Sequence, residues 1–141
     1  MNIAVSYSKF ATSKSGGARE SLLTLLNGIA RNRKITADVF QTPPVDHPPR
    51  TKFEYKIYTK SIWNIPLLTW TNQVFTRMQW ENYIQKQLTR KHNLLITQNR
   101  LAPVSVSVAN KLEIPSLFFV RSIALTGYEK FSPNKSHITN L

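Results

Sequence analysis

The sequence predicts an α/β fold of the Rossmann-like type, in which a doubly wound parallel sheet lies between helices. Short apolar runs alternate with longer amphipathic segments along the 141-residue chain. This alternation is typical of βαβ units, whose crossovers are right-handed. The length suits one domain spanning residues 1–141, because domains usually contain ~100–200 residues.

In the N-terminal part the apolar run Asn2–Tyr7 predicts the first strand. A polar loop over 8–17 ends in a Gly-Gly pair, and apolar residues then recur at helical spacing over 22–30. Thr36–Gln41 predicts the second strand. This strand should end at Pro43-Pro44, because proline cannot continue a central strand.

In the middle of the chain the alternating run Phe53–Tyr58 predicts a third strand. The segment 61–92 has a mainly helical pattern with a break near Pro66. Leu94–Thr97 is another short apolar strand.

Near the C-terminus Pro103 suits the first turn of a helix that runs to about Leu112. The alternation of Val104, Val106 and Val108 leaves a strand open there. Pro115–Val120 predicts the last strand.

The composition limits the chemistry that the chain can perform. Nineteen Lys and Arg against seven Asp and Glu give a net charge of +12, which favours nucleic acid, an anionic membrane or phosphorylated ligands as partners. No cysteine is present, and the three histidines show no metal-ligand spacing, so we expect neither a metal nor a cofactor. Without a signal peptide or ~20 consecutive apolar residues, we expect a cytoplasmic location, with the membrane surface as the alternative.

The loop before the first helix is the first candidate site. Ser15, Gly16, Gly17 and Arg19 surround the predicted helix start. Glycines allow a ligand to approach the backbone, and the free amides of a helix start favour an anion such as a diphosphate. A tight turn is the alternative interpretation, because neither a dinucleotide fingerprint nor a P-loop is present.

Three blocks of the sequence resemble the N-terminal half of GT-B glycosyltransferases of the family 4 (group 1) type. The first is a short strand at 2–5, the Gly-Gly pair at 16–17 and the amphipathic helix. The second is His92–Asn99 with Ala102-Pro103, similar to the family's Asp-Val-Val-His-x-His segment and the helix after it. The third, Leu112–Val120, is similar to the family's Leu-Gly-Ile-Pro and following strand.

The resemblance implies a cleft at the carboxyl ends of the strands, lined by Gln98, Asn99, Arg121 and Ser122. The chain departs from the family where Arg121 stands in place of the usual histidine, so no general base is identified and the catalytic residues stay unknown. Arg121 could clamp a phosphate or carboxylate. An arginine in an ion pair at the rim of the sheet is equally compatible with the sequence.

The segment 61–91 concentrates all the tryptophans of the chain among basic residues. Such a mixture is typical of membrane interfaces, and the same region of family 4 enzymes docks on membranes and binds the acceptor. We therefore expect a membrane or acceptor surface carrying Trp63, Trp70, Arg77 and Trp80. A core helix with a solvated basic face is the alternative.

The resemblance implies an acceptor-binding half of a hexosyltransferase that moves sugar from a nucleotide-sugar to a glycan or lipid-linked acceptor. The family's donor-binding motif lies in a second domain, so we expect this half to be inactive without a donor-binding domain or chain. A basic nucleic-acid-binding module is the alternative from another class, although no RNA- or DNA-binding motif is present. Another Rossmann-like nucleotide-binding domain is the third hypothesis.

Overall fold

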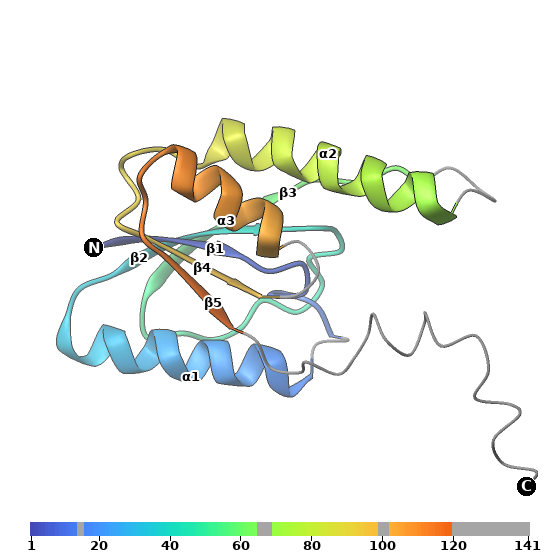
Figure 1. Cartoon of the computed structure of the whole chain (residues 1–141). Helices are drawn as coiled ribbons and strands as arrows, with labels where there is room; N and C mark the ends of the chain where they lie inside the picture. The colour runs from blue at the N-terminus through green and yellow to red at the C-terminus, as the bar shows by residue number, and fades with distance from the viewer. Residues whose placement is uncertain (14–15, 65–68, 99–101, 120–141) are drawn as a thin grey trace, which may run out of the picture.

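A five-stranded parallel sheet with strand order β3-β2-β1-β4-β5 forms the centre of the molecule (Figure 1). The computed structural model describes residues 1–13, 16–64, 69–98 and 102–119. The strands are β1 (Asn2–Ser6), β2 (Thr36–Gln41), β3 (Glu54–Thr59), β4 (Leu94–Gln98) and β5 (Ser116–Phe119). The helices are α1 (Gly17–Asn32), α2 (Thr69–Gln87) and α3 (Ala102–Lys111). This architecture confirms the predicted fold class.

The helices cover the two faces of the sheet unequally, with α1 on one face and α2 and α3 on the other (Figure 1). The central strands β1 and β4 are buried along almost their whole length. Strands covered on both faces are continuous apolar runs, which is why these segments lack alternation. The valines of 104–108 belong to helix α3, so the strand that the sequence left open there does not form.

Each face of the sheet has its own hydrophobic core. On the α1 side, Leu22, Leu23 and Leu26 pack against residues of β1 and β2. On the other side, Trp80 and Ile84 of α2 pack with residues of α3 and of the sheet. The amphipathic helix predicted over 22–30 therefore buries the expected stripe.

A buried hydrogen-bond chain joins α2, α3 and β1. The indole Nε1 of Trp80 donates to Ser105 Oγ at 3.2 Å, and Ser105 Oγ lies 2.7 Å from Ser6 Oγ. Trp80 and Ser105 are 0% exposed. Because buried polar groups need partners, this chain fixes how α2 and α3 sit on the sheet.

A histidine-carboxylate pair fixes the amino-terminal edge of the sheet. His92 Nε2 lies 3.1 Å from Asp38 Oδ2, and the Thr89 amide donates to His92 Nδ1 at 3.1 Å. His92 is buried and joins the residues before β4 to β2. Its role is thus structural, at the edge opposite the carboxyl ends of the strands.

Gly28 gives a direct test of the α1 assignment. It lies inside the helix, and a Cβ added there would meet nothing within 4 Å. Gly28→Ala should therefore raise the free energy of unfolding by about 0.5–1 kcal/mol, because alanine loses less backbone entropy in a helix. Urea denaturation followed by circular dichroism measures the change. A loss of stability would mean that residue 28 is not in an open helical position.

Candidate functional site

The strand order places a switch point between β1 and β4. From β1 the chain passes through α1 to β2 on one side, whereas β4 lies on the other side and leads into α3. Because α1 and α3 cover opposite faces (Figure 1), a crevice is expected outside the carboxyl ends of β1 and β4. The predicted glycine loop follows β1, and Gln98 is the last residue of β4.

Gly16 is the N-cap residue of α1 and has an extended backbone, with φ −99° and ψ −160°. No side chain caps the helix, although the Arg19 amide donates to the Gly16 carbonyl at 2.9 Å. Gly16 and Gly17 are exposed, and a Cβ at Gly16 would meet nothing within 4 Å. The start of α1 is thus open to a ligand, and the fold itself does not require a glycine at position 16.

Gln98 ends β4 and lies against the first turn of α1. Its Nε2 donates to the Ala18 carbonyl at 3.4 Å, and the side chain is buried. The structure therefore places Gln98 beside the first turn of α1, at the residue that follows the Gly16-Gly17 pair. Phe119 of β5 pairs with Gln98 in the sheet. The other predicted residues, Ser15, Asn99, Arg121 and Ser122, lie outside the described residues.

Arg19 is buried beside the same turn, and its side chain forms a hydrogen bond within the protein. Its guanidinium donates to the His47 carbonyl at 3.3 Å, which joins α1 to the segment after β2. The described contact of Arg19 is therefore structural, and its predicted contact with a ligand stays a prediction.

Gln41 is a site-forming residue that the sequence indicated only as the end of a strand. It is 0% exposed, accepts a hydrogen bond from the Ala11 amide at 2.8 Å and donates to the Pro44 carbonyl at 3.0 Å. Thr42 also donates, through Oγ1, to the Ser8 carbonyl at 3.1 Å. These bonds hold the loop between β1 and α1 against the loop after β2. A glutamine closing an apolar strand just before Pro-Pro was the only hint in the sequence.

Asp46 holds the same loop from outside. Its carboxylate accepts hydrogen bonds from Ser13 Oγ at 2.9 Å and from the Ser13 amide at 3.0 Å. The Asp46 and His47 amides both donate to the Ala11 carbonyl at 3.1 Å. The side-chain and backbone hydrogen bonds from Ser13 hold the pKa of Asp46 below its ordinary value of 3.8, and the charge of His47 adds to this effect.

We expect the Ser13–Asp46 hydrogen bonds to weaken at acidic pH. Because the pKa of Asp46 is lower in the folded protein, the ionised carboxylate stabilises the fold fully above its ordinary pKa of 3.8. This stabilisation is lost as the pH falls through the lower pKa of the folded protein. The Ser13 amide resonance, followed by NMR from about pH 6 to about pH 2, should shift only in the acidic part of that range. In Asp46→Asn this step should disappear. A step that persisted in Asp46→Asn would assign the titration to another group.

The prediction of a membrane or acceptor surface was wrong for Trp80, which is 0% exposed in the core between α2, α3 and the sheet. Trp63, in contrast, is 76% exposed. Its backbone N donates to Gln79 Oε1 and its carbonyl accepts from Gln79 Nε2, both at 3.0 Å, so it is held beside α2. Trp70 belongs to α2, but its side chain lies outside the described residues.

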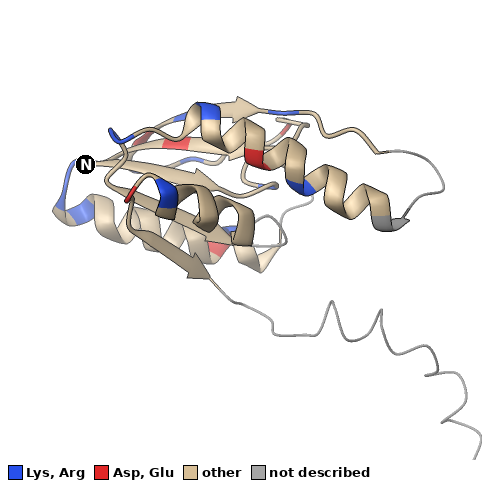
Figure 2. Ribbon diagram, turned by 45° about the horizontal axis from the view of Figure 1, so that its top comes forward, with Lys and Arg blue, Asp and Glu red and all other residues tan. Residues whose placement is uncertain are grey.

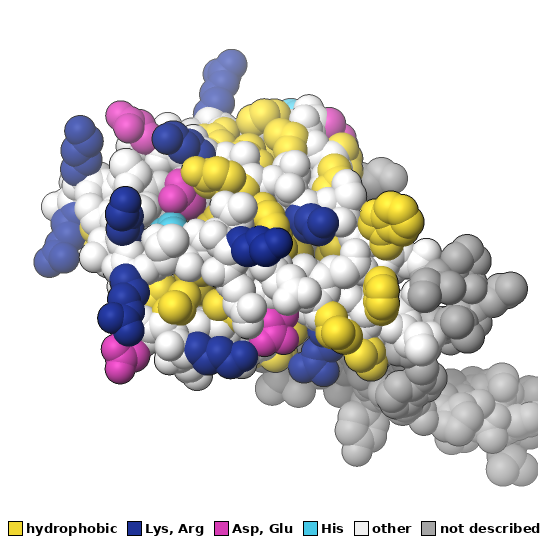
Figure 3. All heavy atoms as spheres, turned by 90° about the horizontal axis from the view of Figure 1, so that it is seen from above, with side chains coloured by type: hydrophobic (Ala, Val, Ile, Leu, Met, Phe, Trp, Pro, Cys, Tyr) yellow, Lys and Arg dark blue, Asp and Glu magenta, His cyan; other side chains and the backbone are white. Residues whose placement is uncertain are grey.

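Three hydrophobic side chains of α2 are nevertheless exposed. Val74, Phe75 and Met78 are 56%, 44% and 56% exposed. Figure 3 views the side of the molecule where α2 and α3 lie, and hydrophobic side chains appear there among Lys and Arg. Together with Trp63, these residues form what we call the α2 surface.

The basic residues are spread over helices and loops (Figure 2), and those in the connections before β2 and β4 lie at the amino-terminal edge of the sheet rather than at the start of α1. The net charge of +12 therefore does not by itself mark one binding face. Within the described ranges, no cluster of three or more His, Asp and Glu side chains could hold a metal ion. Among the helices described, none is long and apolar enough to span a membrane.

The candidate site therefore consists of an uncapped helix start, Gln98 beside it and a loop held by Gln41 and Asp46. Comparison with protein-family models, curated proteins and solved structures found no match for the chain.

Proposed function

We propose that this chain is the acceptor-side, N-terminal half of a GT-B sugar transferase of the family 4 type. The observation that carries the proposal is the uncapped start of α1 lying beside Gln98 at the switch point between β1 and β4. In this proposal the diphosphate of a nucleotide-sugar donor faces Gly16 and Gly17. The glycan or lipid-linked acceptor enters along the same edge.

The chemistry of an exposed helix start supports an anionic ligand. The unpaired amides of the first turn and the helix dipole both favour negative charge. Gly16 leaves open space where a larger residue would stand, and the loop before it is held by buried Gln41. Such a site would act by positioning and by stabilising charge on the leaving diphosphate. A donor-binding domain or chain would complete it.

NMR titration of the full chain with uridine diphosphate tests the proposal. The expected result is a shift of the amide resonances of Gly17 to Glu20 and of the Gln98 side-chain amide, with little change at the His92–Asp38 edge. Steeply salt-dependent binding of oligonucleotides without these shifts would instead support the nucleic-acid-binding module. Binding of a free dinucleotide in preference to uridine diphosphate would support another Rossmann-like nucleotide-binding domain.

The proposal includes a cytoplasmic location with peripheral contact to a membrane through the α2 surface. Exposed tryptophan and aliphatic side chains beside basic residues suit the interface of an anionic bilayer. Co-sedimentation with vesicles containing phosphatidylserine, but not with pure phosphatidylcholine vesicles, is the expected result. Equal recovery with both kinds of vesicle would remove the electrostatic part of this proposal.

A further inference from the structure

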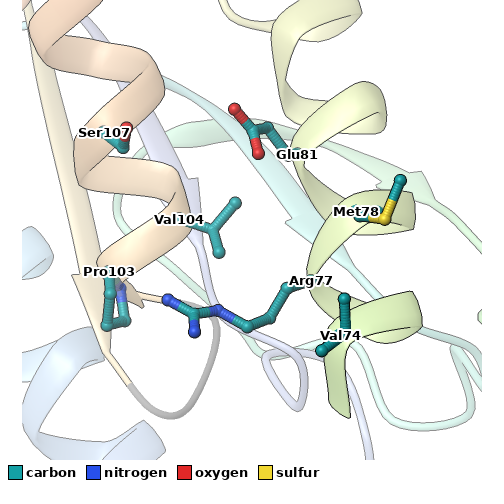
Figure 4. Close-up of a pocket in the computed structure, with 7 residues that line it drawn as sticks. All are labelled: Val74, Arg77, Met78, Glu81, Pro103, Val104 and Ser107. Atoms are coloured by element: carbon teal, nitrogen blue, oxygen red, sulfur yellow. The ribbon is translucent and has the colours of Figure 1, made fainter. Parts of the chain in front are cut away.

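A groove of about 290 Å³ runs between α2 and α3, on the face of the sheet opposite α1 (Figure 4). Val74 and Met78 of α2 form one apolar wall, and Pro103 and Val104 of α3 form the other. Small-molecule pockets commonly have volumes of ~300–1,000 Å³ and mainly apolar walls with a few polar groups. The groove is thus at the small end of ligand sites and has the expected kind of lining.

Arg77 supplies a positive charge at one end of this groove. In Figure 4 its guanidinium extends between the helices toward Pro103. Within the part of the chain that the structure describes, Arg77 forms no ion pair and no hydrogen bond. No described residue therefore occupies its donors, and a guanidinium can bind an oxyanion with two parallel hydrogen bonds.

The carboxylate in the same groove, Glu81, already has a basic partner. Glu81 Oε1 lies 3.1 Å from Lys111 Nζ and accepts from Gln85 Nε2 at 3.3 Å. In Figure 4, Glu81 and Ser107 lie at the end away from Pro103. The groove therefore has an unpaired cation at one end, a neutralised acid at the other and apolar side chains between them.

Size and charge together select the occupant. One helical turn is ~5 Å tall and ~10 Å across and so encloses roughly 400 Å³, which is more than the groove's volume of about 290 Å³. A single aliphatic chain fits the volume and would cover Val74 and Met78, which are each 56% exposed. Its anionic group would then meet Arg77.

We propose that this groove binds an anionic single-chain amphiphile, with a phosphate or carboxylate on Arg77 and the aliphatic chain against Val74, Met78 and Val104. The site is separate from the start of α1 and does not depend on sugar transfer, although it shares Val74 and Met78 with the α2 surface that is proposed to contact a membrane. The ligand could come from solution or from a membrane leaflet, and both sources present the same chemistry.

Octyl phosphate, used as a monomer with the full chain, is the first probe. NMR titration should shift the resonances of Arg77, Met78 and Val104, and octyl trimethylammonium should not. Arg77→Gln should weaken octyl phosphate binding roughly tenfold or more, because hydrogen bonds to charged groups contribute about 1.5–3 kcal/mol. Lys86→Gln is the matched control: it removes one positive charge from an exposed position of α2 outside the groove, and should change the affinity less than about twofold.

Met78→Gln tests the apolar wall at an exposed position, and should weaken octyl phosphate more than it weakens inorganic phosphate. Three results would overturn the proposal: equal losses in Arg77→Gln and Lys86→Gln, equal binding of the cationic and anionic amphiphiles, or binding to anionic vesicles without any binding of octyl phosphate. Gly16→Asp should leave octyl phosphate binding unchanged, which separates failure of this site from failure of the proposed function.

Discussion

Trp80→Ala should lower the free energy of unfolding by about 3–5 kcal/mol, the usual cost of removing a large buried aromatic side chain. Trp80 is 0% exposed and contacts residues of α2, α3 and the sheet in one core. The substitution also removes the donor to Ser105 Oγ at 3.2 Å. Because single domains are stable by only ~5–15 kcal/mol, the loss should be a large part of the total. Urea denaturation followed by far-ultraviolet circular dichroism gives the value.

Trp80→Phe is the control for this prediction. Phenylalanine keeps an aromatic ring in the core but cannot donate to Ser105, so the expected loss is smaller, about 1–3 kcal/mol. Trp63→Ala is a second control, because Trp63 is 76% exposed and should change stability little. If Trp80→Ala lowered the free energy of unfolding no more than Trp63→Ala, Trp80 would not be buried between α2 and the sheet.

Gly16→Asp should weaken the binding of uridine diphosphate at least tenfold while the fold stays intact. An aspartate at the N-cap would place its carboxylate over the first amides of α1, where it would both occupy them and repel an anion. The added side chain has open space, since a Cβ at Gly16 meets nothing within 4 Å, and the backbone there is extended. Stability should change by no more than a few tenths of a kcal/mol. Dissociation constants from NMR titration measure the effect.

Gly28→Asp makes the same change of charge in α1, again where a Cβ would meet nothing within 4 Å. Its affinity for uridine diphosphate should stay within about twofold of the unsubstituted chain, because Gly28 lies three turns from the helix start. Equal losses of affinity in Gly16→Asp and Gly28→Asp would mean that the effect comes from the net charge alone. Unchanged affinity for uridine diphosphate in Gly16→Asp would mean that the glycine pair forms only a turn and does not bind the ligand.

Local sequence features predicted two parts of the candidate site, the helix start and the strand that leads to Gln98. The Gly-Gly pair before an amphipathic segment indicated the start of α1. The apolar run Leu94–Thr97 indicated a strand just before Gln98, and parallel strands bring their carboxyl ends to one edge. The contact between Gln98 Nε2 and the Ala18 carbonyl at 3.4 Å follows from these two facts together with the strand order.

Helix α2 shows where such reasoning fails. Its aromatic and aliphatic residues occur around the whole helix, so a pattern of spacing did not identify one buried side. Trp80, Ile84 and Leu88 follow one another at intervals of four residues and are buried, whereas Val74, Phe75 and Met78 are exposed. The sequence therefore predicts one surface for the tryptophans, whereas Trp80 belongs to the core and Trp63 is exposed.

By itself, the sequence determined the alternation of strands and helices, the parallel sheet and the glycine pair at a helix start, because these depend on periodicity and on backbone preferences of neighbouring residues. Only the tertiary structure decided which side of α2 is buried, that Gln41 and Asp46 hold the loop before α1, and that Arg77 lies in a groove without an ion pair to any other described residue. Each of these depends on residues that are distant in the chain or on different elements, and burial and hydrogen bonding between such residues are fixed only when the helices pack on the sheet.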